Sequence, residues 1–257
     1  MIDSDENSDL EEDQIGLTPR FEDAEALQSR MFDTICRDLL SEDEQVRFNA
    51  INLIEYFECD PRLAQFILML FEREDIQLTR AGVQALGAWR HSDGVPLLIN
   101  FLTNANNANR LPELEEEIIL SLGRIGGSDA LEFLENYTLQ RFADHKNDED
   151  CLGMAGIEGI ASIAAKGHDR AVQFLMRGCK QSSWNMRESC ADSFGVLFSG
   201  KEKISKNVYD LLMQLTKDEN KNVRIAAYLS LDAIVGLDEQ NKKILAEARH
   251  KQIFGEK

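Results

Sequence analysis

One short pattern recurs along the chain and constrains the fold more than any other feature. It consists of a branched or long apolar residue, often followed by arginine, then a small residue four positions on and an apolar pair before a glycine-like position. Residues 46–50 (VRFNA) and 223–227 (VRIAA) match it well. The small-residue positions of the six copies are Ala50, Gly82, Ile118, Gly156, Cys190 and Ala227. Their spacing of 32 to 38 residues predicts an array of similar stacked units.

Two copies are degenerate, since the one at Ile118 lacks the small residue and the one at Gly156 has Gly153 in place of the arginine. Between the copies, apolar residues recur with i, i+3, i+4 spacing, which is typical of an amphipathic helix. These runs cover residues 63–70, 95–102, 130–137, 171–175 and 208–215. Turn residues such as those at 126–129 and 167–169 separate the helices, so each unit is expected to be a helical hairpin.

This pattern resembles the HEAT repeat, in particular the short bacterial HEAT-like repeats of the phycobilisome-lyase type, whose consensus reads D-x-x-V-R-x-x-A-x-x-A-L-G. The resemblance covers residues 22–236. It implies an all-α, right-handed α-solenoid of about six hairpins, with the signature helices on the inner, concave side and the other helices on the convex side. It also implies that Arg47, Arg187 and Arg224 are structural, each bonding the acidic turn residue of the preceding repeat.

A helical hairpin cannot bury its own apolar face, so neighbours must supply the core and the ends of an array must be covered. Residues 1–20 hold seven acids and one arginine with few apolar residues, the composition of a disordered tail. We therefore expect an acidic disordered tail at 1–20, a HEAT-repeat array at 21–237, and a capping helix with a short tail at 238–257. The capping helix would cover Ile225 and Leu229.

Charge, hydropathy and cysteine usage exclude several classes of function. A net charge of −18 disfavours nucleic acid as a partner, because phosphates are bound mainly by Lys and Arg. No apolar run approaches the roughly 18–20 residues of a membrane span, and the N-terminus has no secretory signal pattern. We expect a cytoplasmic monomer without membrane insertion. The five cysteines contain no CxxC pair, which predicts buried reduced thiols.

The sequence offers no catalytic motif, neither a nucleophile elbow nor a phosphate loop nor a kinase-like motif. Its four histidines have neither HxxxH nor HxH spacing: His91, His145, His168 and His250. The pair His168 and Cys179 should lie at opposite ends of one helix, about 16 Å apart, too far for a dyad. The acidic loop at 144–150 could offer metal ligands, but a solvated loop is the preferred interpretation. We expect no enzyme activity, no cofactor and no metal.

Three functions fit a HEAT-type array, and the preferred one is a non-catalytic protein-interaction scaffold, adaptor or assembly factor. The alternative is a bilin-lyase-like subunit or pigment-protein chaperone, for which no motif provides a test. A HEAT-type DNA glycosylase is less favoured, because it needs a cationic groove for the duplex. The middle of the expected groove is instead acidic, with Glu116, Glu117, Glu158, Glu188 and Asp192.

Partner-binding residues are expected where two positions, four residues apart, recur on the open face of each signature helix. The N-terminal third of this ridge mixes aromatic and basic residues, types that are enriched at interface hot spots, and its middle is acidic. The candidates are Phe48, Asn52, Tyr56, Arg80, Gln84, Trp89, Glu116, Arg124, Met154, Glu158, Glu188 and Asp192. Other interpretations stay open: Phe48 and Tyr56 capping the first core, Trp89 as a core aromatic, and the acids as a solvated face.

Overall fold

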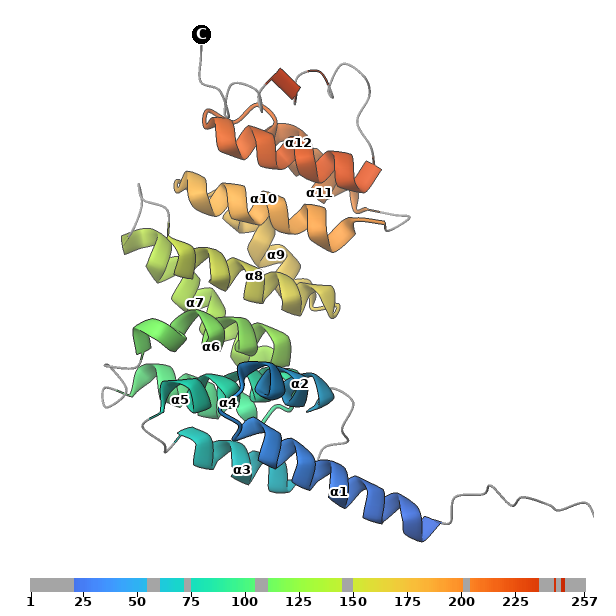
Figure 1. Cartoon of the computed structure of the whole chain (residues 1–257). Helices are drawn as coiled ribbons and strands as arrows, with labels where there is room; N and C mark the ends of the chain where they lie inside the picture. Colours follow the sequence, from blue (N-terminus) through green and yellow to red (C-terminus); the bar gives the residue numbers. More distant parts are fainter. Residues whose placement is uncertain are drawn as a thin grey trace, which may run out of the picture.

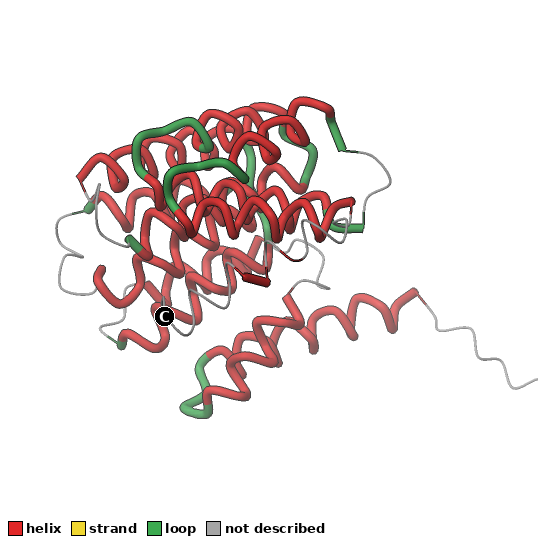
Figure 2. Tube along the Cα trace, turned by 90° about the horizontal axis from the view of Figure 1, so that it is seen from above, coloured by secondary structure: helices red, strands yellow, loops and turns green. Residues whose placement is uncertain are grey.

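The computed structural model describes residues 21–54, 61–71, 75–104, 111–144, 150–200 and 204–235, together with residues 243, 246 and 247. Over these residues the chain forms twelve α-helices joined by loops and contains no strand (Figures 1 and 2). The helices are α1 (Phe21–Leu39), α2 (Glu44–Ile54), α3 (Pro61–Phe71), α4 (Ile76–Trp89), α5 (Gly94–Thr103), α6 (Leu111–Ile125), α7 (Ser128–Asp144), α8 (Cys151–Ala165), α9 (Asp169–Gly178), α10 (Trp184–Phe198), α11 (Lys206–Leu215) and α12 (Lys221–Val235).

Each odd-numbered helix packs on the even-numbered helix that follows it, which makes six hairpins and confirms the predicted α-solenoid. The even-numbered helices also pack on one another in succession from α2 to α12, whereas successive odd-numbered helices touch only marginally. Figure 1 shows α4, α6, α8, α10 and α12 rising one above the other. Because the even layer is the more closely packed one, the stack curves with that layer inside. The signature helices therefore line the inner face, as the resemblance implied.

Local turn chemistry explains where the helices begin and end. Asp75 caps α4 by accepting hydrogen bonds from the backbone N–H groups of residues 77 and 78, and Ser183 and Ser205 cap α10 and α11 in the same way. Between α6 and α7, Gly126 and Gly127 have φ values of 80° and 90°, which side chains with a Cβ rarely adopt. These positions confirm the predicted breaks.

Small residues serve two separate packing surfaces. Gly82 and Gly156, two of the small residues of the recurring pattern, face the outer helix of their own hairpin. A Cβ at Gly82 would lie 3.0 Å from a ring carbon of Phe71. The neighbouring inner helix approaches at other glycines, such as Gly87, five positions after Gly82, and Gly123, where a Cβ would lie 2.8 Å from the carbonyl oxygen of Gly159 on α8. Over five residues the side-chain direction rotates by about 140° around the helix axis. One side of the inner helix therefore contacts the outer helix of its own hairpin, and another side contacts the neighbouring inner helix. These stacking glycines recur every 36 residues, at 87, 123, 159 and 195.

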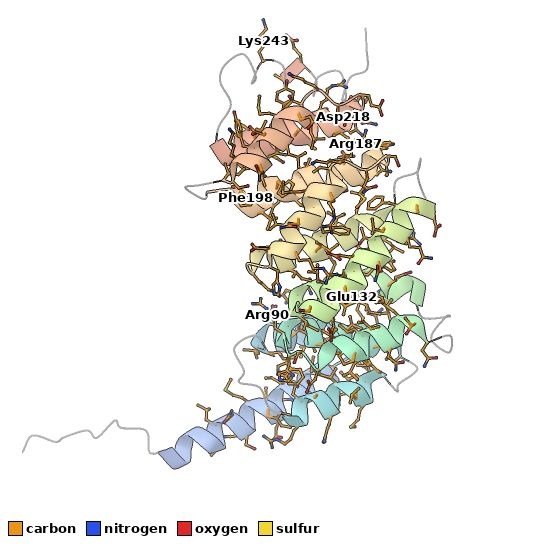
Figure 3. All side chains as sticks on the ribbon, turned by 180° about the vertical axis from the view of Figure 1, so that it is seen from behind. Arg90, Glu132, Arg187, Phe198, Asp218 and Lys243 are labelled. Carbon is orange, nitrogen blue, oxygen red and sulfur yellow. The ribbon has the colours of Figure 1, made fainter. Side chains whose placement is uncertain are left out.

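The signature arginines bind partners other than the expected acidic residue of the preceding repeat. Each of Arg47, Arg187 and Arg224 donates to the backbone carbonyls six and five residues earlier, within the turn that leads into its own helix, at 2.7–3.0 Å. The arginine stands in the first turn of the helix, so its long side chain reaches back to that turn. Arg187 also donates to both carboxylate oxygens of Asp218 in the following repeat (Figure 3), at 2.8 and 2.9 Å.

The predicted N-terminal tail at 1–20 lies outside the described residues, as does the cap at 238–257 apart from three exposed residues, of which Lys243 is labelled in Figure 3. The capping helix was expected to cover Ile225, and the residue is 7% exposed. None of the described helices has the length and apolar content that a membrane span requires.

The prediction of buried thiols holds for Cys179 and Cys190 and is wrong for Cys151, which is exposed. Cys151 is the first residue of α8, where the helix emerges at the inner face. Cys36 is half-buried.

Candidate functional site

A groove of about 460 Å³ runs over the inner face of α6, α8 and α10. Four of the predicted partner-binding residues line it: Glu116, Met154, Glu158 and Asp192. They lie together because α6, α8 and α10 pack on one another in succession, and α6 approaches α8 closely where Gly123 meets Gly159. The structure therefore brings the acidic middle of the expected ridge into one concave surface. Glu188, also on α10, is half-buried and is not among the lining residues.

The groove combines exposed apolar groups with carboxylates that have no partner among the residues that the structure describes. Val196 is 81% exposed and Met154 is 44% exposed, both unusual for large apolar side chains. Within the described part of the chain, Glu116, Glu158 and Asp192 form no hydrogen bond and no ion pair. The side chain of Asp192 keeps contact with solvent, yet its partial burial in the groove raises the pKa of this carboxyl group. The surface is therefore apolar and anionic at once.

Sequence reasoning missed two polar groups of the groove wall. The hydroxyl of Ser189 is inaccessible to solvent and finds no hydrogen-bond partner among the described residues, although Ser193 donates to its backbone carbonyl at 2.9 Å. The thiol-bearing residue Cys151 opens onto the same groove. Neither residue was a predicted site residue, because both flank the recurring ridge positions and do not occupy them.

The N-terminal candidates form a second, smaller surface on α2 and α4. Phe48 is 55% exposed and borders a hollow of about 90 Å³ together with Arg80 and Gln84. The amide of Gln84 donates to Glu117 of α6 at 3.1 Å and so also ties two repeats together. Asn52 is exposed on α2, and Tyr56 lies outside the described residues.

Trp89 and Arg124 lie away from both surfaces, toward the C-terminal ends of the inner helices. Trp89 is half-buried against the core and stacks on His91 with 4.6 Å between ring centroids, which fits the interpretation as a core aromatic. Arg124 is exposed in the last turn of α6. Lys166, at the end of α8, donates to the backbone carbonyls of Gly123 and Arg124, and its pKa is lowered by burial and by the charge of a neighbouring arginine. This edge is cationic, in contrast to the groove.

The groups considered for chemistry are separated or already paired. His168 and Cys179 flank α9 at its two ends, as predicted. The carboxylate of Asp150 accepts from Arg141 at 2.6 and 3.0 Å, and residues 145–149 of the acidic loop lie outside the described residues. The described residues contain no cluster of three or more His, Cys, Asp or Glu side chains that could hold a metal ion.

Stacked hairpins with glycine contacts between successive inner helices define the class as an α-helical repeat protein. Residues 63–145, from α3 to the end of α7, match the family model of HEAT repeats, which confirms the resemblance seen in the sequence. A comparison with curated protein sequences finds no match. Eleven chains of solved structures match. One of them is human deoxyhypusine hydroxylase in complex with glycerol, with 15% identity and a TM-score of 0.37 over 82% of this chain and 98% of that one.

Proposed function

We propose that the protein is a non-catalytic interaction scaffold, an adaptor or assembly factor, that binds a protein partner on the concave face of its HEAT-repeat array. The groove over α6, α8 and α10 carries the proposal, because it exposes large apolar side chains next to carboxylates that the described chain leaves unpaired. Exposed apolar surface within a polar rim is typical of protein interaction sites. The anionic groove disfavours binding of nucleic acid. We also propose that the protein is a cytoplasmic monomer before it binds its partner.

The hollow on α2 and α4 supports a second anchor of the same partner. Phe48 presents an exposed aromatic ring and lines the same hollow as Arg80, and aromatic residues and arginine are frequent in binding hot spots. The groove and this hollow are both carried by inner helices that pack in succession, so one extended partner could contact both.

Cross-linking tests which face binds the partner. A photoreactive amino acid is placed at Asn52 or Ser162 on inner helices and, as matched controls, at Gln65 or Gln173, which are exposed on outer helices. The full chain is irradiated in native lysate and adducts are identified by mass spectrometry. We expect discrete protein adducts from the inner positions alone. Adducts that form only from the outer positions would move the functional surface to the convex side and refute the proposal.

Affinity measurements then test the anchor, once the partner is purified. Replacing Phe48 by Ala should weaken binding by about 1–3 kcal/mol if it is a hot spot, mostly through faster dissociation. Replacing Leu139 by Ala, an apolar residue 44% exposed on the outer helix α7, provides the control and should leave the affinity unchanged.

A further inference from the structure

The shape and chemistry of the groove over α6, α8 and α10 restrict what can occupy it. Its walls come entirely from side chains of three stacked helices, whose backbone N–H and C=O groups are already hydrogen-bonded within each helix. An extended peptide would find no sheet edge there to pair its own backbone. A helix satisfies its backbone groups internally and can lay one face into such a groove. The occupant that fits best is therefore helical.

The apolar groups of the groove require an apolar face on that helix. Met154 on α8 and Val196 on α10 are exposed, and the small side chains Ala155 and Ala161 lie between larger neighbours on the same walls. Covering Met154 and Val196 with apolar side chains would remove their exposed surface from water, which is the main favourable term in association. A basic helix without an apolar face would leave the side chains of Met154 and Val196 exposed to water.

The carboxylates of the groove require positive charge beside that face. Glu116, Glu158 and Asp192 come from three successive inner helices and have no cationic partner within the described residues. Inner helices that pack at about 8–10 Å place the outermost of these acids about 16–20 Å apart. A helix covers that distance in about 11–13 residues, so Lys or Arg side chains about two turns apart on its flank would reach all three.

We infer that the groove over α6, α8 and α10 binds a basic amphipathic helix of about three turns, supplied by the partner protein. This inference rests on the proposed scaffold function and specifies the chemistry of its partner. The apolar face of the partner helix covers Met154 and Val196. Lysine or arginine side chains on its flank pair with Glu116, Glu158 and Asp192.

A synthetic peptide provides a defined probe for the full-length protein. The probe has about 16 residues, with leucine on one helical face and lysine on both flanks, and two control peptides accompany it. The first control has the same composition in an order that destroys the amphipathic pattern. The second carries glutamate in place of every lysine. Fluorescence anisotropy should show saturable binding of the probe, binding of the scrambled peptide at least roughly tenfold weaker, and no binding of the acidic peptide.

Paired variants locate the binding site. The double variant Glu158→Gln, Asp192→Asn should weaken binding of the probe roughly tenfold and reduce its salt dependence. The control variant Glu132→Gln, Asp169→Asn makes the same charge change at exposed positions of the outer helices, one of them labelled in Figure 3, and should bind as the parent does. Val196→Ser tests the apolar contact, and since Val196 is 81% exposed this change leaves the core intact. Circular dichroism verifies that each variant is folded.

Several outcomes would overturn the inference. Equal binding of the scrambled peptide would mean that charge alone attracts the probe, and equal loss in the outer-face variant would place the probe elsewhere. The chain's own basic stretch at 241–254 is a further probe, and if it binds more tightly than the designed helix while light scattering shows a dimer, the occupant is a second copy. If the probe peptide does not bind but inner-face positions still cross-link to a protein partner, the inference of a basic helix is refuted and the proposed scaffold function is retained.

Discussion

The joint between the last two hairpins depends on Arg187, and its replacement by methionine gives a quantitative test of how the array is held together. The arginine side chain is 9% exposed and the Asp218 side chain 10% exposed, and two hydrogen bonds of 2.8 and 2.9 Å join them. Two further bonds of 2.9 Å run to backbone carbonyls of the turn before α10. Methionine keeps most of the aliphatic volume but leaves the carboxylate and both carbonyls without this partner.

The expected cost follows from what Asp218 retains. Removing one member of a buried ion pair typically costs about 3–5 kcal/mol. Asp218 still accepts from the backbone N–H of Asn220 at 2.8 Å and still feels the charge of Arg224, so we expect a value near the lower end, about 3 kcal/mol. Replacing both residues, as Arg187→Met with Asp218→Asn, should cost less than the sum of the single changes, with a coupling of about 1–3 kcal/mol.

The pH dependence of this effect has a definite sign. Burial opposes ionisation of Asp218, but the hydrogen bonds from Arg187 and Asn220 and the charges of Arg187 and Arg224 outweigh it, so the pKa lies below its ordinary value. The stabilisation is therefore complete above the unfolded-state pKa of about 3.9 and is lost as the pH falls through the lower folded-state pKa. The difference between parent and Arg187→Met should be largest near pH 7 and should shrink below about pH 4.

Urea unfolding followed by circular dichroism measures the stability change, and hydrogen exchange shows whether α11 and α12 open first. Arg177→Met is the matched control, because the Arg177 side chain is 59% exposed and lies 3.9 Å from its acidic neighbour on α7. This control should change the stability little. If Arg187→Met were no more destabilising than Arg177→Met at pH 7, the buried pair would not hold the two hairpins together and the reasoning would fail.

Four further changes test separate features of the array. Gly123→Ala should destabilise the protein by about 1–3 kcal/mol, because the added Cβ would lie 2.8 Å from a carbonyl oxygen of α8, and denaturant unfolding measures it. Asp192→Asn should raise the melting temperature at neutral pH, since burial disfavours the ionised carboxyl, and the gain should disappear on acidification as the parent carboxyl becomes protonated. Glu132→Gln on the outer face should not change it. Removing residues 1–20 should leave the melting curve unchanged, and removing 238–257 should cause aggregation detectable by light scattering, in line with a disordered tail and a cap.

The features that the sequence alone determined are those that depend on neighbouring residues. The apolar spacing around Leu63 and Val208 predicts a helix because side chains three and four apart share one face. The breaks at 126–129 and 167–169 are predicted because glycine readily adopts the positive φ that ends a helix, and this effect acts within one turn of backbone. The recurrence of these local signals about every 36 residues was enough to predict a HEAT-type array of six hairpins.

Partners across the stack could not be predicted in the same way. Arg187 was expected to bond the repeat before it, yet it binds Asp218 in the repeat after it. Cys151 was expected to be buried, yet it opens onto the groove. The sequence is compatible with both the expected and the observed contacts of these two residues. Only the rotation of one helix relative to the next decides which neighbour each side chain meets.

The candidate site shows the same division. The sequence alone indicated an acidic, partly apolar ridge through Met154, Glu158 and Asp192, because their spacing puts them on the open side of each signature helix. Tertiary structure decided that α6, α8 and α10 pack in succession, with α6 and α8 in close approach at Gly123 and Gly159, and so joined these positions into one groove with Val196. Helix periodicity is a property of one segment, whereas a groove is a distance between segments, and that distance is set by how the side chains of separate repeats pack.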